Sequence, residues 1–137
     1  MQFTDLVPRA SITLMRRGIP VMGEREARLL EAIERVHSIK DAAREAGISY
    51  RTAWGAIQLM ERAFGRPVVE SRAGGPGGGG TTLTDECHDL LHAYQEVRRH
   101  LDSDLARVWA SAGNGGPQWV GTLPDDGQRV AREGRQP

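Results

Sequence analysis

Cysteine is almost absent from this chain, which has a single one, Cys87, among 137 residues. One cysteine excludes an internal disulfide and fits a reducing compartment. Aromatic residues make up only 5% of the chain, and no apolar run approaches the ~20 residues of a membrane-spanning helix. The N-terminal stretch, MQFTDLVPRASITLMRRG, lacks the long central apolar region of a secretion signal. We therefore expect a cytoplasmic protein with one modest core and no membrane partner.

Net charge is also absent, since the formal total is zero. The charges are nevertheless segregated along the chain. Residues 47–84 carry four Arg and two Glu, which gives +2, whereas residues 85–112 carry three Arg and six acidic residues, which gives −3. A polyanion responds to this local field rather than to the total. An ordinary solvated surface would look similar, so the charge pattern alone does not establish a nucleic-acid partner.

The stretch 48–64, ISYRTAWGAIQLMERAF, predicts one helix with two different faces. Its apolar residues recur at spacings of three and four and predict the buried face: Ala53, Trp54, Ile57, Met60 and Phe64. The other face is polar and partly basic: Tyr50, Arg51, Gly55, Gln58 and Arg62. Glycine inside a helix costs about 1 kcal/mol relative to alanine. Gly55 therefore indicates that something outside the helix approaches it closely.

A second helix directly precedes this one and predicts a helix-turn-helix. Ser38 followed three residues later by Asp41 is a variant of the capping box that starts a helix. The inner face of this helix is small, with Ala42, Ala43 and Ala46, so another helix can cross it closely. Gly47 allows the positive φ of a tight turn, and Ser49 suits the N-cap of the next helix. The alternative is a helical hairpin with no DNA-binding role.

The remaining elements predict a winged helix-turn-helix, mainly α with a small β-hairpin. Short strands are expected at 11–15 and 19–22, before a helix that starts near Glu24. Further strands at 67–70 and 81–84 flank the loop AGGPGGGG, which would be the wing. Glycine amides can approach phosphate closely, and Arg72 adds charge at the base of the loop. The alternative is a loop that makes no contact.

A long helix is expected over 85–112, with Thr84 as its N-cap. Five residues of this helix form an apolar stripe at spacings of mostly three and four: Leu90, Tyr94, Val97, Leu101 and Val108. Because the helix is longer than a small core needs, we interpret the stripe as a dimer interface. The alternative is that the stripe covers the core of its own chain. The winged domain with this helix would span residues 1–112, followed by a flexible Gly- and Pro-rich tail over 113–137.

Enzymatic and metal-binding patterns are weak. The Gly-rich loop lacks the Gly-Lys-Ser/Thr of a phosphate-binding loop. His88 and His92 are spaced as in zinc proteases, but the intervening acid is Asp and no third ligand is in reach. Cys87 is most simply a small buried residue. We expect no cofactor, no metal and no catalytic site.

Taken in order, several segments resemble one known family: residues 48–54 (ISYRTAW), Ala56-Ile57, Val69-Glu70, Gly74-Gly75, residues 77–80 (GGGG) and Leu83-Thr84. The resemblance is to the N-terminal DNA-binding domain of the ModE-type molybdate-responsive transcriptional regulators, with a LysR-like winged helix-turn-helix, and it covers roughly residues 11–108. It implies a homodimer that binds a double-stranded DNA operator in the nucleoid. Full-length members continue into two β-barrel domains that bind molybdate or tungstate. About 25 residues follow here, so the resemblance does not extend to oxyanion sensing, and a separate effector-sensing protein is an expected partner.

Candidate site residues follow from these interpretations. Base reading is assigned to Arg51, Thr52, Gly55 and Gln58, because Arg pairs with guanine and Gln with adenine in the major groove. Phosphate contacts are assigned to the residues around the helix and in the wing: Ser49, Tyr50, Arg62, Arg72, Gly74, Gly75, Gly77, Gly78, Gly79 and Gly80. The alternative function is a winged-helix module that binds protein and no longer reads DNA.

Overall fold

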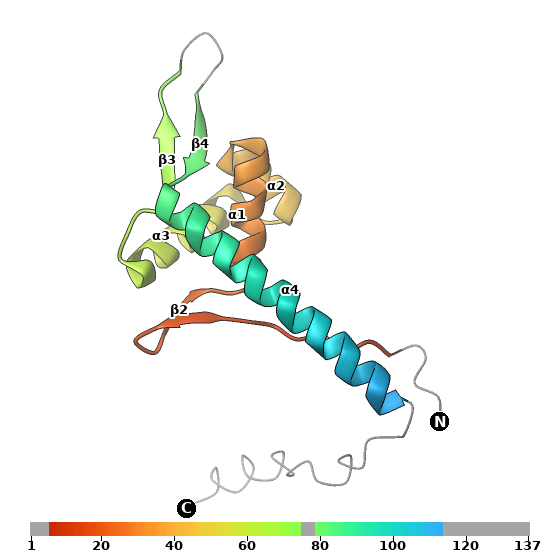
Figure 1. Ribbon diagram of the computed structural model, residues 1–137. Helices are drawn as coiled ribbons and strands as arrows, with labels where there is room; N and C mark the ends of the chain where they lie inside the picture. The colour runs from red at the N-terminus through yellow and green to blue at the C-terminus, as the bar shows by residue number, and fades with distance from the viewer. Residues whose placement is uncertain (1–5, 75–78, 114–137) are drawn as a thin grey trace, which may run out of the picture. The chain divides into compact units, whose positions relative to one another are not determined.

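The computed structural model describes residues 6–74 and 79–113 of the chain and has a winged helix-turn-helix fold (Figure 1). The order of its elements is β1 (Leu14–Arg16), β2 (Ile19–Met22), α1 (Glu24–Val36), α2 (Ile39–Ala46), α3 (Tyr50–Phe64), β3 (Val69–Arg72), β4 (Gly80–Leu83) and α4 (Asp85–Gly113). The chain divides into two compact units, and residues 9–103 form the larger one. The predicted fold class is confirmed. The wing glycines Gly75, Gly77 and Gly78 and the tail from residue 114 onward lie outside the described residues.

Side-chain caps fix the helix boundaries. The Ser38 hydroxyl accepts a hydrogen bond from the Asp41 amide at 3.1 Å, and α2 begins at Ile39, directly after Ser38. The Thr84 hydroxyl accepts from the Cys87 amide at 3.2 Å and donates to the Pro67 carbonyl at 2.8 Å, which starts α4. Such bonds satisfy amide donors that the first helical turn leaves without a partner. The predicted helix starts at Glu24, Ser38 and Asp85 are confirmed to within one residue.

The boundaries of three strands differ from the prediction, and for β4 the difference is one residue, 80–83 rather than 81–84. The turn at Arg17 and Gly18 pairs Arg16 with Ile19, so β1 covers 14–16 rather than 11–15. The register shifts between Leu14 and Met15, and the pairing with β2 goes no further than Leu14, which pairs with Met22. In the wing, Arg72 pairs with Gly80, and β3 covers 69–72 rather than 67–70.

The core of the larger unit is built from all four helices and the strand ends. The fully buried side chains include Leu29 and Leu30 of α1, Ile57 of α3, and Leu91 and Tyr94 of α4. The small inner face predicted for α2 is confirmed, since Ala42 and Ala43 are buried against the same core. Close packing over these alanines holds α2 and α3 in the crossed arrangement of the motif.

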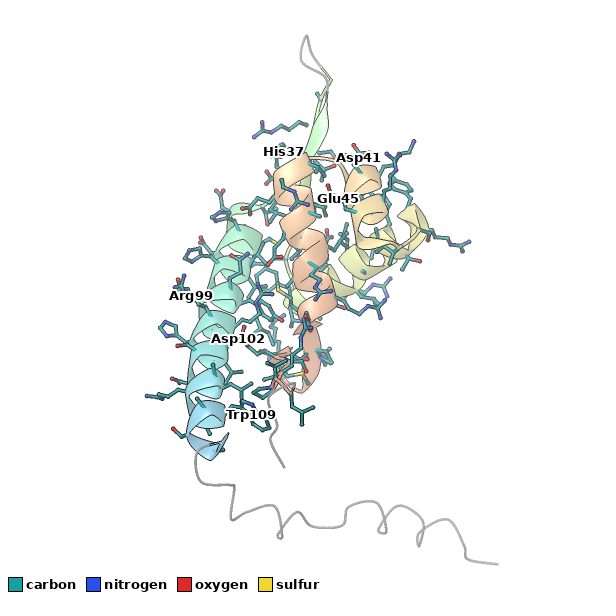
Figure 2. All side chains as sticks on the ribbon, turned by 90° about the vertical axis from the view of Figure 1, so that its right-hand side faces the viewer. His37, Asp41, Glu45, Arg99, Asp102 and Trp109 are labelled. Atoms are coloured by element: carbon teal, nitrogen blue, oxygen red, sulfur yellow. The ribbon has the colours of Figure 1, made fainter. Side chains whose placement is uncertain are left out.

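The wing is attached to the turn between α1 and α2. The Thr81 amide donates to the His37 carbonyl at 2.9 Å, and Figure 2 shows His37 at the end of α1 beside the wing strands. A Cβ added at Gly80 would lie 2.9 Å from this carbonyl oxygen. Gly80 therefore has a reason within the protein itself for lacking a side chain.

The smaller unit contains the start and the end of the described chain. In this unit, Nε1 of Trp109 donates a hydrogen bond to the Leu6 carbonyl at 3.1 Å. This bond ties the first described residues to the last turns of α4.

Candidate nucleic-acid interface

Gly55 lies at the centre of the outward face of α3. A Cβ built on it would meet nothing within 4 Å among the described residues, so the protein itself gives no steric reason for a glycine. Residues three, four or seven positions away share the same side of a helix. The five residues of α3 at those positions are all exposed, namely Arg51, Thr52, Gln58, Leu59 and Arg62. The predicted polar face is therefore turned to solvent around a flat central position.

The opposite face of α3 packs into the core as predicted. Ala53, Ile57 and Met60 are buried, and Trp54 and Phe64 pack against the core at its edge. This packing fixes which side of α3 faces outward.

The N-terminal end of α3 is held by Ser49 and Thr52. The Ser49 hydroxyl accepts a hydrogen bond from the Thr52 amide at 3.0 Å, and the two hydroxyl oxygens are 2.8 Å apart. Each hydroxyl has a further lone pair or proton that a partner can use. Tyr50 is exposed, and its ring meets the edge of Trp54 with the ring centres 6.3 Å apart. The cap thus positions the polar groups assigned to this end of the site.

The turn before α3 sets its crossing on α2. Gly47 has a φ of 69°, which is the left-handed conformation that the sequence predicted. Its amide donates back to α2, and the Ile48 amide donates to the Ala43 carbonyl at 3.0 Å. These bonds close the last turn of α2 and direct the chain into α3. Figure 2 shows Asp41 and Glu45 on α2, and Glu45 pairs with Arg35 of α1.

In the wing, fewer of the residues assigned to phosphate contacts are open to a partner. Arg72 and Gly74 are exposed and unobstructed, and a Cβ at Gly74 would only reach ordinary contact, 3.7 Å from the Gly79 amide nitrogen. Gly79 is different, because its Cβ would lie 2.7 Å from the Arg72 carbonyl oxygen. Gly79 and Gly80 are thus constrained by their own chain. Among the described wing residues, Gly74 and Arg72 are therefore the ones whose substitution tests a ligand contact separately from the fold.

Sequence reasoning missed Leu59. Its side chain is 64% exposed, and it lies four residues after Gly55 on the same outward face. Its spacing of four from Gly55 is the signal that would have placed it on the outward face. An apolar side chain in a major groove contacts the thymine methyl group, so Leu59 extends the candidate base-reading set.

The stripe on α4 has two different environments. Tyr94 is only 1% exposed and donates its hydroxyl proton to the Ile12 carbonyl at 3.4 Å, and Leu90 packs against the same core. For Tyr94 the interpretation as a free dimer surface is wrong, because its own chain covers it, whereas Leu90 is only half-buried. Val97 is 51% and Leu101 is 39% exposed, and Val108 is exposed further along the helix.

Cys87 is a buried structural residue, as its position predicted. Burial, reinforced by the carboxylates of Glu34 and Glu61, raises the pKa of its thiol to about 12. A thiol with this pKa stays protonated at neutral pH and is neither a nucleophile nor a metal ligand. Within residues 6–74 and 79–113, no three His, Cys, Asp or Glu side chains come together as a metal site. No helix in that part of the chain is long and apolar enough to cross a membrane.

Comparison with known proteins agrees with this geometry. Residues 25–88 match the bacterial regulatory helix-turn-helix proteins of the lysR family. This segment is a LysR-family helix-turn-helix domain. The match begins in α1 and ends in the first turn of α4, so it contains the whole motif and the wing. A helix-turn-helix domain of this family is a regulatory DNA-binding domain and not a catalytic one.

Three relatives illustrate the similarity. The chain is 45% identical over 86 residues to the molybdenum-pterin-binding protein MopB of Rhodobacter capsulatus, and the aligned part is 63% of this chain and 32% of that protein. It is 41% identical over 85 residues to MopA of the same organism, covering 62% of this chain and 32% of that protein. It is 41% identical over 70 residues to the DNA-binding transcriptional dual regulator ModE of Escherichia coli, covering 51% and 27%. The chain thus spans about a third of the length of these relatives.

Proposed function

We propose that this LysR-type domain acts as a homodimeric, sequence-specific transcriptional regulator linked to molybdenum or tungsten metabolism in the cytoplasm. The observation that carries the proposal is the outward face of α3, where exposed polar side chains surround an unobstructed glycine. This arrangement suits a helix in a major groove, since long side chains can reach base edges while the centre of the helix lies close to them. The molybdenum link rests on the similarity to the molybdenum-pterin-binding proteins MopA and MopB.

Arg51 and Gln58 are the proposed base readers. They lie on either side of Gly55, four residues before it and three after it, and both are exposed. Arg suits the two acceptors of guanine, and the Gln amide suits the donor and acceptor of adenine. Thr52 and Leu59 border the same face and would contact neighbouring bases. Ser49, Tyr50 and Arg62 would hold phosphates at its edges.

We predict that Arg51→Ala and Gln58→Ala each weaken operator binding by about 1–3 kcal/mol and relax the preference at one base position. The site is first selected from a random duplex library with the wild-type protein. Binding is then measured on a series with each base pair substituted. Arg99→Ala, which removes an exposed arginine from α4, is the matched control and should change neither the affinity nor the base preference. Wild-type affinity and base preference in both α3 variants would rule out these roles.

We predict that Gly74→Asp weakens binding to every duplex by a similar factor, about fivefold. The added Cβ would make only an ordinary contact, 3.7 Å from the Gly79 amide nitrogen, but the carboxylate would repel a phosphate beside the wing. Phosphate contacts carry no direct sequence information, so base preference should not change. His92→Asp puts a carboxylate on α4 and controls for net charge. A loss restricted to some sequences would indicate base readout by the wing, and no loss would make the wing a bystander.

A winged-helix module that binds another protein is the second candidate. Leu59 and Ile19 favour it, because both are exposed and line the same groove, and exposed apolar patches mark protein interaction sites. A separate effector-sensing protein would be one such partner. A genome-wide binding map of the tagged protein distinguishes the candidates, since a DNA reader yields one recurring sequence under its peaks and an interaction module does not.

A further inference from the structure

The β1–β2 hairpin is tied to the C-terminal end of α3. Nη1 of Arg16 donates to the carbonyls of Phe64 at 3.0 Å and Ala63 at 3.4 Å. A cation at this position also compensates the negative end of the helix dipole. Gly65 leaves the space for it, since a Cβ there would lie 2.5 Å from the same nitrogen. The hairpin is therefore held in place relative to the recognition helix.

The residue at the tip of the hairpin is unexpected for its conformation. Arg17 and Gly18 form the two-residue turn, with φ values of 52° and 79°. Both residues are left-handed, as in a type I′ turn, where Asn-Gly is strongly preferred at these positions. Arginine gains nothing from this conformation, because positive φ is uncommon for residues other than Gly and Asn. The turn itself thus does not explain a cationic side chain at its exposed tip.

The hairpin and the outward face of α3 border the same groove. Ile19 and Pro20 of the hairpin line it together with Gly55, Leu59 and Arg62 of α3. Arg25 of α1 lines the groove as well. Among the described side chains, Arg17, Arg25 and Arg62 form no ion pair, so each keeps an unneutralised guanidinium.

The hairpin and the wing lie on opposite sides of α3 in Figure 1, with β2 below it and β3–β4 above it. A helix inside a major groove has a sugar–phosphate strand on each side. We propose that the β1–β2 hairpin is a second backbone-binding element, in which Arg17, with Arg25 and Arg62, binds phosphates on the side of α3 away from the wing. This inference rests on the proposed function, because it requires α3 to enter DNA.

Arg17→Asn tests the proposal with little risk to the fold. Asparagine is preferred in this turn, so the variant should melt at the wild-type temperature or above it, while it loses the tip charge. Affinity for a mixed-sequence duplex at low salt should fall about tenfold, which is the effect of one charged hydrogen bond. The slope of log K against log salt should become shallower by about 1, and the base preference on the selected site should stay the same.

Two further variants complete the test. Arg17→Lys keeps a charge that can bind phosphate and should recover most of the affinity. Arg99→Gln removes one exposed arginine from α4 and should change neither the affinity nor the slope. Wild-type affinity and slope in Arg17→Asn would overturn the proposal, as would an equal loss in Arg99→Gln or an altered oligomeric state of Arg17→Asn. If the wild-type protein binds no duplex at all, the proposed function fails as well. Binding that is lost only in the α3 variants rejects the hairpin contact alone.

Discussion

Replacing Gly55 by glutamate is expected to abolish DNA binding while the domain stays folded. In the free protein the new side chain has open space, because nothing lies within 4 Å of its Cβ position. Glutamate is also a better helix former than glycine by about 0.5–1 kcal/mol, so the melting temperature should rise slightly. In a complex, the same carboxylate would stand between Arg51, Gln58 and the bases. The negative phosphates on both sides of the groove would repel this carboxylate, and juxtaposed like charges cost several kcal/mol, so the affinity should fall more than about 100-fold.

Gly55→Ala separates size from charge in this experiment. A methyl group adds no charge and stabilises the helix in the same way, so the melting temperature should again rise. Its DNA affinity should lie between those of the wild type and the glutamate variant, because one methyl group keeps α3 only slightly farther from the bases. Binding by fluorescence anisotropy and melting by circular dichroism would be measured on the same samples. Unchanged affinity in Gly55→Glu would show that the centre of α3 does not meet DNA, and the protein-interaction candidate would then be preferred.

The helices were predictable from the sequence because their signals are local. Ser38, Ser49 and Thr84 each satisfy amides within three residues of themselves. The strands were predicted less well because their ends depend on a partner strand. Residues 11–13 have suitable side chains for a strand, but the turn at Arg17 and the irregular register at Leu14 leave them without regular pairing.

In the candidate site as well, the features set by local spacing were predictable and those set by distant residues were not. Spacing on one helix was sufficient to place Arg51, Gln58 and Arg62 together on an exposed face. Leu59 was not assigned to either face, although its spacing of four from Gly55 places it on the same exposed face. The constraint on Gly80 could not be inferred, since it comes from the His37 carbonyl, which is far away in the sequence.

The stripe on α4 shows a further limit of periodicity. A regular apolar stripe tells which side of a helix is covered, but not which molecule covers it. The first two residues of the stripe, Leu90 and Tyr94, pack against the core of their own chain. Val97 and Leu101 continue the same spacing after the core has ended, and both remain substantially exposed. A second copy of the chain would bury them and would place two recognition helices on one duplex, as operators with two half-sites require.

Val97→Asp combined with Leu101→Asp is therefore expected to convert a dimer into a folded monomer. Neither side chain is part of the buried core, so the melting curve of the unit should keep its cooperativity. In a dimer, two carboxylates from each copy would face each other across an apolar contact. Linked half-sites raise affinity by 10²–10⁴-fold through effective concentration, so the operator affinity of the monomer should fall by about that factor. Its weaker affinity for a single half-site should remain.

His92→Asp is the matched control for this pair. It adds a carboxylate to the same helix at an exposed position two residues before Tyr94, on the side away from the stripe. This variant should remain a dimer and bind the operator as the wild type does. Sedimentation and light scattering would give the molecular mass of each variant at the concentrations used for binding. If the double variant remains dimeric, the copies associate through another surface, and the exposed part of the α4 stripe is not the interface.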